Sequence, residues 1–271
     1  MFKFKFCLPF LASILVLVNV NVFGQSWEFG GFLGGAGYLG DLNPANPAKV
    51  NNLAFGGQIK RCFDPYWALK LAVTHGRIEA YDSDSKDAFQ RDRNLRFITP
   101  ITEISLQTEF NFFNYVPSHS KKRWSPFLFA GLGLVAFNPK ADYQGQVVDL
   151  RLFGTEGQDP TDPYREYAFT VPFGAGVKYN LTGKWSLNAE AGYRTAYTDY
   201  LDDVSGKYPD DADLMGSPGY EARKALSDRS LSGGKASGSQ RGDYRKRDTY
   251  MFVGLSITYS IFKGGCPVVA N

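Results

Sequence analysis

Apolar residues alternate with small or polar residues along the segment from Asp248 to Phe262, near the C-terminus. The odd-numbered positions are apolar or aromatic and most positions between them are small or polar: Met251, Val253, Leu255, Ile257, Tyr259 and Ile261 against Gly254, Ser256, Thr258 and Ser260. A period of two is typical of a β-strand with two different faces. Aromatic ends and a small inner face favour the closing strand of an outer-membrane barrel, with lipid outside and a packed interior.

Seven further segments upstream show strand-like alternation, and each is bounded by Gly, Pro, Asn or Asp. All eight lie near Trp27–Gly40, Leu53–Phe63, Tyr66–Tyr81, Arg96–Tyr115, Trp124–Phe137, Glu166–Leu181, Lys184–Tyr200 and Thr249–Phe262. The pattern predicts an all-β fold, an eight-stranded antiparallel transmembrane β-barrel of OmpX or OmpA size.

The connections between these segments alternate in length. Asp64-Pro65, Val116–Arg123 and Thr182-Gly183 are short, whereas Asp41–Asn52, Asp82–Leu95, Asn138–Arg165 and Leu201–Asp248 are long. This asymmetry predicts short periplasmic turns and long extracellular loops.

Tryptophan positions test the topology independently. Trp27, Trp67, Trp124 and Trp185 all fall at the start of the first, third, fifth and seventh segments, which predicts one aromatic girdle at the periplasmic interface. Tyr115 is expected in the same girdle, and Tyr197, Tyr200 and Tyr250 in a second one at the opposite mouth. The alternative is a soluble sandwich with core tryptophans, but such a sandwich has no reason to place every Trp at one end.

Parity along the strands assigns side chains to the barrel interior. The fourth segment turns Ile104 and Leu106 toward lipid and Glu103 and Glu109 inward. The full predicted interior charge network is Lys60, Lys70, Glu103, Glu109, Lys178, Glu190 and Arg194. Eight strands leave room only for side chains, so these charges are expected to pair as a plug rather than to line a channel. The two Gly-rich segments, the first and the fifth, do not reveal their parity.

The N-terminus predicts targeting to the envelope. Residues 1–24 carry Lys3 and Lys5 before an apolar run, which is typical of a secretory signal peptide. Residues 25–263 then form the barrel in the outer membrane, and residues 264–271 form a periplasmic tail. Loss of Lys3 and Lys5 lowers the formal net charge from +3 to +1. A near-neutral chain gives no electrostatic case for nucleic acid.

The sequence gives little support for catalysis. His75 faces lipid by parity and His119 lies in a periplasmic turn, so neither is placed to activate a nucleophile. We expect no enzyme activity and no cofactor. Asp199, Asp202 and Asp203 crowd one strand end and could ligate calcium, although pairing with Arg241, Arg245 or Arg247 is the alternative. The segment Lys224–Arg247 has the composition of a solvated flexible loop.

Two cysteines remain after signal cleavage. Cys62 ends the second segment and Cys266 follows the last, so both belong at the periplasmic end, in an oxidising compartment. An internal disulfide requires their Cα atoms to lie within about 7 Å. The alternatives are a bond from Cys266 to a periplasmic partner, which would act as a tether, or free thiols.

Short strings along the chain resemble a known family. They are Trp27-Glu28-Phe29-Gly30-Gly31, Gly40-Asp41-Leu42-Asn43, Arg93-Asn94-Leu95, Phe137-Asn138-Pro139-Lys140-Ala141, Thr155-Glu156-Gly157-Gln158, Arg194-Thr195, Thr198–Ser205, Gln240-Arg241-Gly242 and Cys266-Pro267. Together they resemble the PorG-type outer-membrane barrels of the type IX secretion system, across essentially the whole mature chain.

The resemblance implies a non-enzymatic barrel that acts as an anchor, scaffold or assembly component of the type IX secretion and gliding machinery. Its implied partners are outer-membrane lipid and a periplasmic ring, built from a lipoprotein and its partner subunit. The alternative is a free-standing small barrel that serves in adhesion or envelope stability. A plugged interior is compatible with either role.

Overall fold

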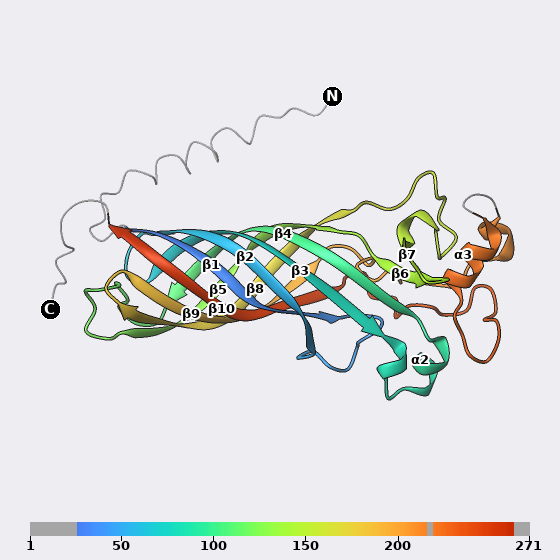
Figure 1. Ribbon diagram of the computed structural model, residues 1–271, viewed down its shortest axis with the longest axis horizontal. Coiled ribbons are helices and arrows are strands. Elements are labelled where there is room, and N and C mark those ends of the chain that lie inside the picture. The colour runs from blue at the N-terminus through green and yellow to red at the C-terminus, as the bar shows by residue number, and fades with distance from the viewer. Residues whose placement is uncertain (1–25, 216–218, 263–271) are drawn as a thin grey trace, which may run out of the picture.

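The computed structural model describes residues 26–215 and 219–262, which form a long β-barrel with a folded region at one end (Figure 1). The barrel strands are β1 (Ser26–Leu39), β2 (Val50–Cys62), β3 (Trp67–Tyr81), β4 (Arg96–Asn111), β5 (Trp124–Phe137), β8 (Tyr167–Thr182), β9 (Trp185–Ala196) and β10 (Thr249–Phe262). Each pairs antiparallel with its neighbours in the order β3-β2-β1-β10-β9-β8-β5-β4, and β3 pairs with β4 to close the ring. The predicted eight-stranded barrel is confirmed.

The connections at the two ends of the barrel differ as the sequence predicts. The four long connections contain the hairpin β6 (Lys140–Tyr143) and β7 (Gln146–Asp149), the helices α2 (Ala88–Arg93) and α3 (Tyr220–Ser227), and three short 3-10 turns at Asp82–Asp84, Leu150–Leu152 and Asp211–Leu214. We call this folded region the outer cap. The predicted signal peptide and periplasmic tail lie outside the described residues. None of the helices within the described ranges is long and apolar enough to cross a membrane.

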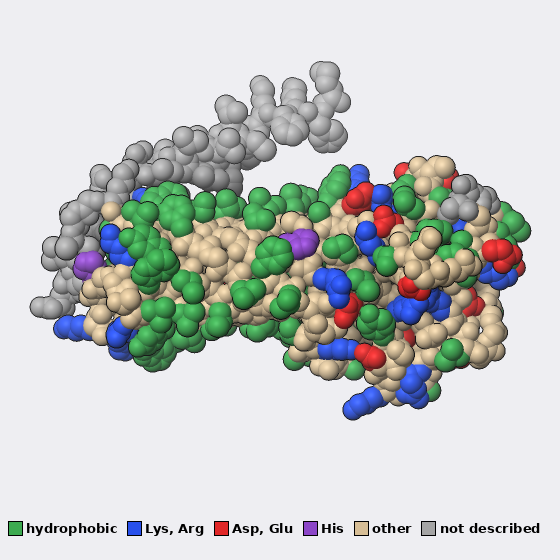
Figure 2. Space-filling model, in the orientation of Figure 1, with side chains coloured by type: hydrophobic (Ala, Val, Ile, Leu, Met, Phe, Trp, Pro, Cys, Tyr) green, Lys and Arg blue, Asp and Glu red, His purple; other side chains and the backbone are tan. Residues whose placement is uncertain are grey.

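The outer wall of the barrel is an apolar belt (Figure 2), and a ring of tryptophan lies at one end of it. The four tryptophans face outward and are 40–47% exposed: Trp27, Trp67, Trp124 and Trp185. At the other end the wall becomes polar, where Arg77 pairs with Glu79 at 3.2 Å and its Nε donates to Asn52. Charged side chains gather on the cap rather than on the belt (Figure 2). A belt of this kind lies in the lipid of the outer membrane, with the short turns in the periplasm.

The second aromatic girdle is only partly present. Tyr197 is exposed, but Tyr250 is fully buried in the barrel, where its hydroxyl donates to Glu103 at 2.5 Å. Tyr200 stacks on Tyr164 in the outer cap, with ring centroids 4.3 Å apart. Tyr115 is also buried at the periplasmic end, where its hydroxyl donates to Ser186 at 2.7 Å. Tyr115 and Tyr250 turn inward because their hydroxyls find partners there.

Glycines in the wall make room for aromatic rings inside it. A Cβ added to Gly174 or Gly192 would lie 2.6 or 2.5 Å from Cζ of Phe129, and one added to Gly176 would lie 2.5 Å from Phe127. Both rings belong to β5, and they are buried. The three glycines lie in β8 and β9, and they leave room for the rings of β5. The parity of β1 and β5 is hidden in the sequence because their inward positions mix glycine with aromatic, polar and apolar residues.

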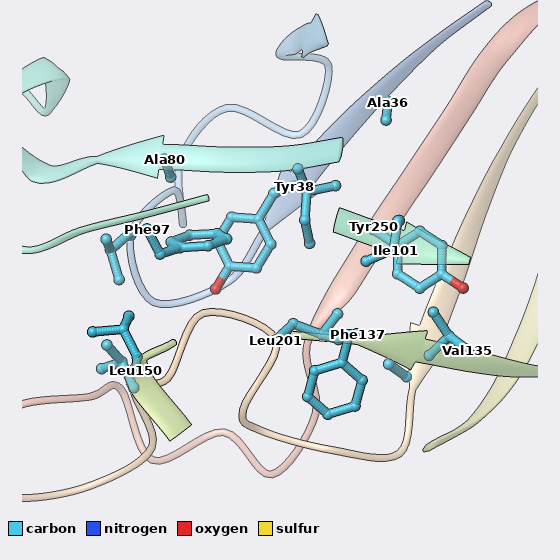
Figure 3. Close-up of a cluster of buried hydrophobic side chains, with 14 of the residues drawn as sticks. Ala36, Tyr38, Ala80, Phe97, Ile101, Val135, Phe137, Leu150, Leu201 and Tyr250 are labelled. Carbon is cyan, nitrogen blue, oxygen red and sulfur yellow. The ribbon is translucent and has the colours of Figure 1, made fainter. Parts of the chain in front are cut away.

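The outer mouth of the barrel is closed by a hydrophobic cluster that continues into the outer cap (Figure 3). Tyr38 packs edge-to-face on Phe97, with ring centroids 4.8 Å apart. Leu201, from the connection between β9 and β10, is fully buried, and its carbonyl accepts a 2.6 Å hydrogen bond from Thr99 of β4. The long loops therefore share a core with the barrel.

Candidate functional site

Glu109 of β4 is the centre of the charge network inside the barrel. Its carboxylate lies 2.8 Å from Lys60 Nζ, 3.2 Å from Lys70 Nζ and 2.6 Å from Lys178 Nζ. All four side chains are almost fully buried. Lys60 and Lys70 face each other across β2 and β3, so an anion between them is required to offset their repulsion.

Three further carboxylates complete the network. Lys70 also contacts Glu190 at 3.0 Å, Arg194 lies 3.7 Å from Glu103, and Lys60 lies 3.6 Å from Glu28. All seven predicted residues face the interior, as parity requires. Glu28 is the one that sequence reasoning missed, because the glycines of β1 hide its parity. With Glu28 the network holds four cations and four carboxylates, and no net charge remains.

Aromatic rings fill the space between these charges. Lys178 lies 4.6 Å from the ring centroid of Phe127, Lys70 lies 4.7 Å from that of Phe129, and the Arg194 guanidinium lies 4.7 Å from that of Phe252. A cation over an aromatic face is stabilised by the ring quadrupole. The interior therefore contains paired charges with aromatic rings between them, the arrangement that the plug hypothesis expects.

A second ionic network holds the outer cap together, and its first member is Arg93. Helix α2 is capped at its N-terminus by Asp87, which accepts a 2.8 Å hydrogen bond from the Phe89 amide, and at its C-terminus by Asn94 in the left-handed conformation (φ 54°). Asn tolerates this conformation. This geometry places Arg93 against Asp82, with two N–H···O bonds of 2.7 Å and both side chains buried.

Arg241 is the other buried guanidinium of the outer cap. It donates to Glu156 at 3.0 Å and to the carbonyl of Asp203 at 2.7 Å, and its own carbonyl accepts a hydrogen bond from Arg93. The carboxylate of Glu156 also accepts the backbone N–H of Ser205 at 2.9 Å. The prediction of a solvated flexible loop is thus wrong at Arg241, which is 2% exposed.

Strings that carry the family resemblance meet in this network, although they come from different loops. They are Gly40–Asn43, Arg93–Leu95, Thr155–Gln158, Thr198–Ser205 and Gln240–Gly242. Besides the contacts of Arg93 and Arg241, Thr155 donates to Asp203 at 2.5 Å, and Arg93 donates to the carbonyl of Asp41 at 3.1 Å. We call these five strings the cap knot.

Three carboxylates converge at the cap knot, and two of them belong to it. Asp41, Asp199 and Asp248 each place one oxygen within 4.8 Å of the other two, a spacing that could hold a metal ion. The three aspartates of the calcium hypothesis do not form this group, since only Asp199 belongs to both. The hydroxyl of Tyr38 donates to Asp202 at 2.5 Å, and Tyr164 donates to Asp203 at 2.6 Å.

Burial raises the pKa of these carboxyls. It raises the pKa of Asp41 to about 7, aided by the charges of Asp243 and Asp199 and opposed by the Asp243 amide. It raises the pKa of Asp199 to about 6, and that of Asp203 to about 6 against the pull of Arg241. The pKa values of Asp202 and Asp248 are raised well above the ordinary value, again by burial first.

The two histidines lie apart from both networks. His75 is exposed on the outer wall, with Nδ1 2.9 Å from the Thr102 hydroxyl, and His119 Nδ1 lies 3.0 Å from the carbonyl of Pro117. Cys62 lies at the end of β2, as expected, beside Glu28 and Lys60 of the interior network, and forms no disulfide in the described part of the chain. Cys266 lies outside the described residues, so its disulfide or tether stays a prediction.

Three comparisons place the chain among known proteins. Solved structures similar to it include OprG of Pseudomonas aeruginosa (11% identity, 87% of this chain and 96% of that one, TM-score 0.41) and the N-terminal barrel domain of Pseudomonas aeruginosa OprF (14%, 87% and 97%, 0.36). Outer membrane protein W of E. coli is another (13%, 89% and 100%, 0.38). At these scores the likeness carries no argument beyond the strand pairing described above.

Curated proteins give no match to the chain. A family model does match, over residues 8–216, which is more than half of the sequence. Its description is "Domain of unknown function (DUF6089)". The chain belongs to this family, DUF6089.

Proposed function

We propose that the protein is a non-enzymatic outer-membrane anchor or assembly component of the type IX secretion and gliding machinery, and that its periplasmic side contacts the ring of that machinery. The observation that carries the proposal is the cap knot. The strings that resemble the PorG-type barrels are far apart in sequence, yet five of them form one buried hydrogen-bonded network. If the short strings matched the family by chance, there would be no reason for them to lie in contact in the folded protein.

The interior network supports an anchor rather than a conduit. Four cations and four carboxylates fill the barrel, and a hydrophobic cluster covers its outer mouth. A barrel of eight strands has no space for a polypeptide beside these side chains. In a secretion machine such a barrel serves by holding other subunits at the membrane.

Site-specific photo-crosslinking in cells tests the proposal. A photoreactive residue at Asn114, exposed in the periplasmic turn, is expected to give adducts with the ring lipoprotein or its partner subunit. The same residue at Leu231, 72% exposed on the outer cap, is the matched control and is expected to give none of them. If a folded barrel with the photoreactive residue at Asn114 gave no adducts with subunits of the periplasmic ring, the proposal would be overturned.

The second candidate is a free-standing barrel in adhesion or envelope stability. The folded outer cap favours it, because a rigid extracellular surface suits contact with another surface. Adducts to extracellular or surface proteins at Leu231, together with none to periplasmic subunits at Asn114, would support this candidate instead.

A further inference from the structure

Cations at the periplasmic end of the barrel lie over aromatic rings of the outer wall. Lys122 Nζ lies 4.1 Å from the ring centroid of Phe113, and the Arg123 guanidinium lies 5.4 Å from that of Tyr179. A further case is Lys184, whose Nζ lies 5.9 Å from the ring centroid of Tyr259. These distances are within the range of cation–π attraction.

The rings under these cations belong to the tryptophan level of the wall. Phe113 packs edge-to-face on Trp124, with ring centroids 5.1 Å apart, and Tyr259 packs on Trp185 at the same distance. Outward-facing tryptophan marks the depth at which lipid headgroups begin. The cations therefore stand beside the headgroups of the periplasmic leaflet, and not under the barrel. Blue side chains lie next to the green belt at this end in Figure 2.

Little negative charge neutralises these cations. Among the described residues, no ion pair includes Lys121, Lys122 or Lys184. The carboxylate of Asp64, in the turn between β2 and β3, accepts the backbone N–H groups of Tyr66 and Trp67, both at 2.7 Å. Glu28, an acid of the interior network, is buried against Lys60.

We propose that Lys121, Lys122 and Lys184 form an anionic-phospholipid site on the barrel wall, which binds headgroup phosphates of the periplasmic leaflet. Arg123 lies beside them and donates through Nε and Nη2 to the carbonyls of Asn180 and Leu181. The stacked geometry selects lipid over an acidic protein, because the rings beneath the cations face the bilayer. The headgroup phosphate of a lipid bound there contacts an ammonium group, and the acyl chains of that lipid lie along the aromatic belt. The inference is independent of the secretion role.

Trp67 supplies a contrast within the same barrel. Its ring packs on Phe110 with centroids 4.9 Å apart, and its backbone N–H donates to the carboxylate of Asp64 in the preceding turn. The sector at Trp185 should therefore prefer anionic lipid, and the sector at Trp67 should not. Since all four tryptophans lie at this interface, a chain that keeps only one of them reports the lipid beside that one sector by its fluorescence.

The test uses the purified chain in bilayers of phosphatidylcholine and phosphatidylglycerol, with bromine near the headgroup of one lipid at a time. In a chain that keeps only Trp185, we expect phosphatidylglycerol to be preferred about five-fold, or about 1 kcal/mol for one cation. In a chain that keeps only Trp67, we expect equal quenching. Lys184→Gln should abolish the preference at Trp185, whereas Lys207→Gln, an exposed residue of the outer cap, should leave it.

Equal quenching of Trp185 by both lipids, or a preference that survives Lys184→Gln, would overturn the lipid site. Lys184→Gln could instead abolish the crosslinks from Asn114 to subunits of the periplasmic ring while the wild-type chain shows no lipid preference. That result would assign the cations to a protein partner. Native mass spectrometry of the chain with all four tryptophans provides a second measurement if a single-Trp chain folds poorly. It should retain more phosphatidylglycerol than phosphatidylcholine, and less after Lys121→Gln, Lys122→Gln and Lys184→Gln are combined.

Discussion

The barrel interior and the outer cap are both built on buried ion pairs, but different parts of the chain hold them. Inside the barrel, Glu109 and its three lysines project from strands whose backbone ladder fixes every position. In the cap, Arg241 reaches Glu156 across 85 residues, and both lie in loops. The strands of the sheet fix the positions of the interior charges. In the cap the ion pairs themselves hold the loops in position.

This difference determines what each network does for the protein. Loss of one partner of an interior ion pair keeps the hydrogen bonds between the strands, but it leaves a buried charge without a partner in surroundings that cannot solvate it. Loss of a pair in the cap lets the loops open toward water, where the freed charge is hydrated. We therefore expect interior variants to lower the stability of the whole barrel, and cap variants to act locally.

Glu109→Gln should have the largest effect. It leaves three buried ammonium groups beside a neutral amide, and breaking a buried pair costs about 3–5 kcal/mol. The free energy of unfolding of the barrel, measured by urea titration in lipid with heat-modifiable migration as the signal, should fall by that amount. The matched control is Glu166→Gln, a 53% exposed partner of Arg151, which should lose about 0–1 kcal/mol. Equal losses in the two variants would contradict the comparison.

Arg241→Gln should open the cap without unfolding the barrel. Glu156 loses its buried partner, and we expect the local opening free energy of the cap to fall by about 3 kcal/mol. Hydrogen exchange should accelerate in residues 153–158 and 201–206 and stay unchanged in β4 and β8. Arg245→Gln, whose side chain is 65% exposed, is the control. Global loss of exchange protection in Arg241→Gln would show that the two networks are not separate.

Ile257→Arg tests the parity that places the interior charges. Ile257 is 50% exposed on the lipid face of β10, and Arg near the bilayer centre should cost about 2–4 kcal/mol. Folding yield and heat-modifiable migration should fall accordingly. Ile257→Leu is the control and should behave like the wild-type chain. Normal migration and yield of the Arg variant would argue against this orientation of β10.

Rising pH should weaken the cap alone. Asp41, Asp199 and Asp203 have folded-state pKa values of about 7, 6 and 6, above the ordinary value, so the folded cap binds protons more tightly than the unfolded chain. Their contribution is complete below about pH 4 and is lost as pH rises through about 6 to 7. Backbone hydrogen exchange in the outer cap, corrected for the intrinsic exchange rates, should be faster at pH 8 than at pH 5. Asp41→Asn with Asp199→Asn should flatten this dependence; an unchanged slope would contradict it.

Periodicity predicted the barrel and its interior because a strand has only two faces. Once the alternation in β4 is read, Glu103 and Glu109 must face inward together. The same reasoning failed for Glu28, because the glycines of β1 leave no polar contrast, and for Tyr250, because an aromatic ring suits either the interface or a hydrogen-bonded interior.

The cap knot could not be derived from periodicity, since its members lie in loops with no repeating face. Arg93 meets Arg241 only through tertiary packing of loops that are 148 positions apart. The sequence did contain one signal, the strings that resemble the PorG-type barrels. These strings include Glu156 and Arg241, but they do not indicate that the two side chains are in contact. The composition of Lys224–Arg247 pointed the other way, because buried arginine and solvated arginine look alike in a sequence.

Single-channel recording in planar bilayers tests most directly the claim that this barrel is a closed anchor. The purified wild-type chain, folded by the criterion of heat-modifiable migration, should give no steady conductance, because paired charges and aromatic rings fill its interior. A stable open pore of porin size would contradict the account.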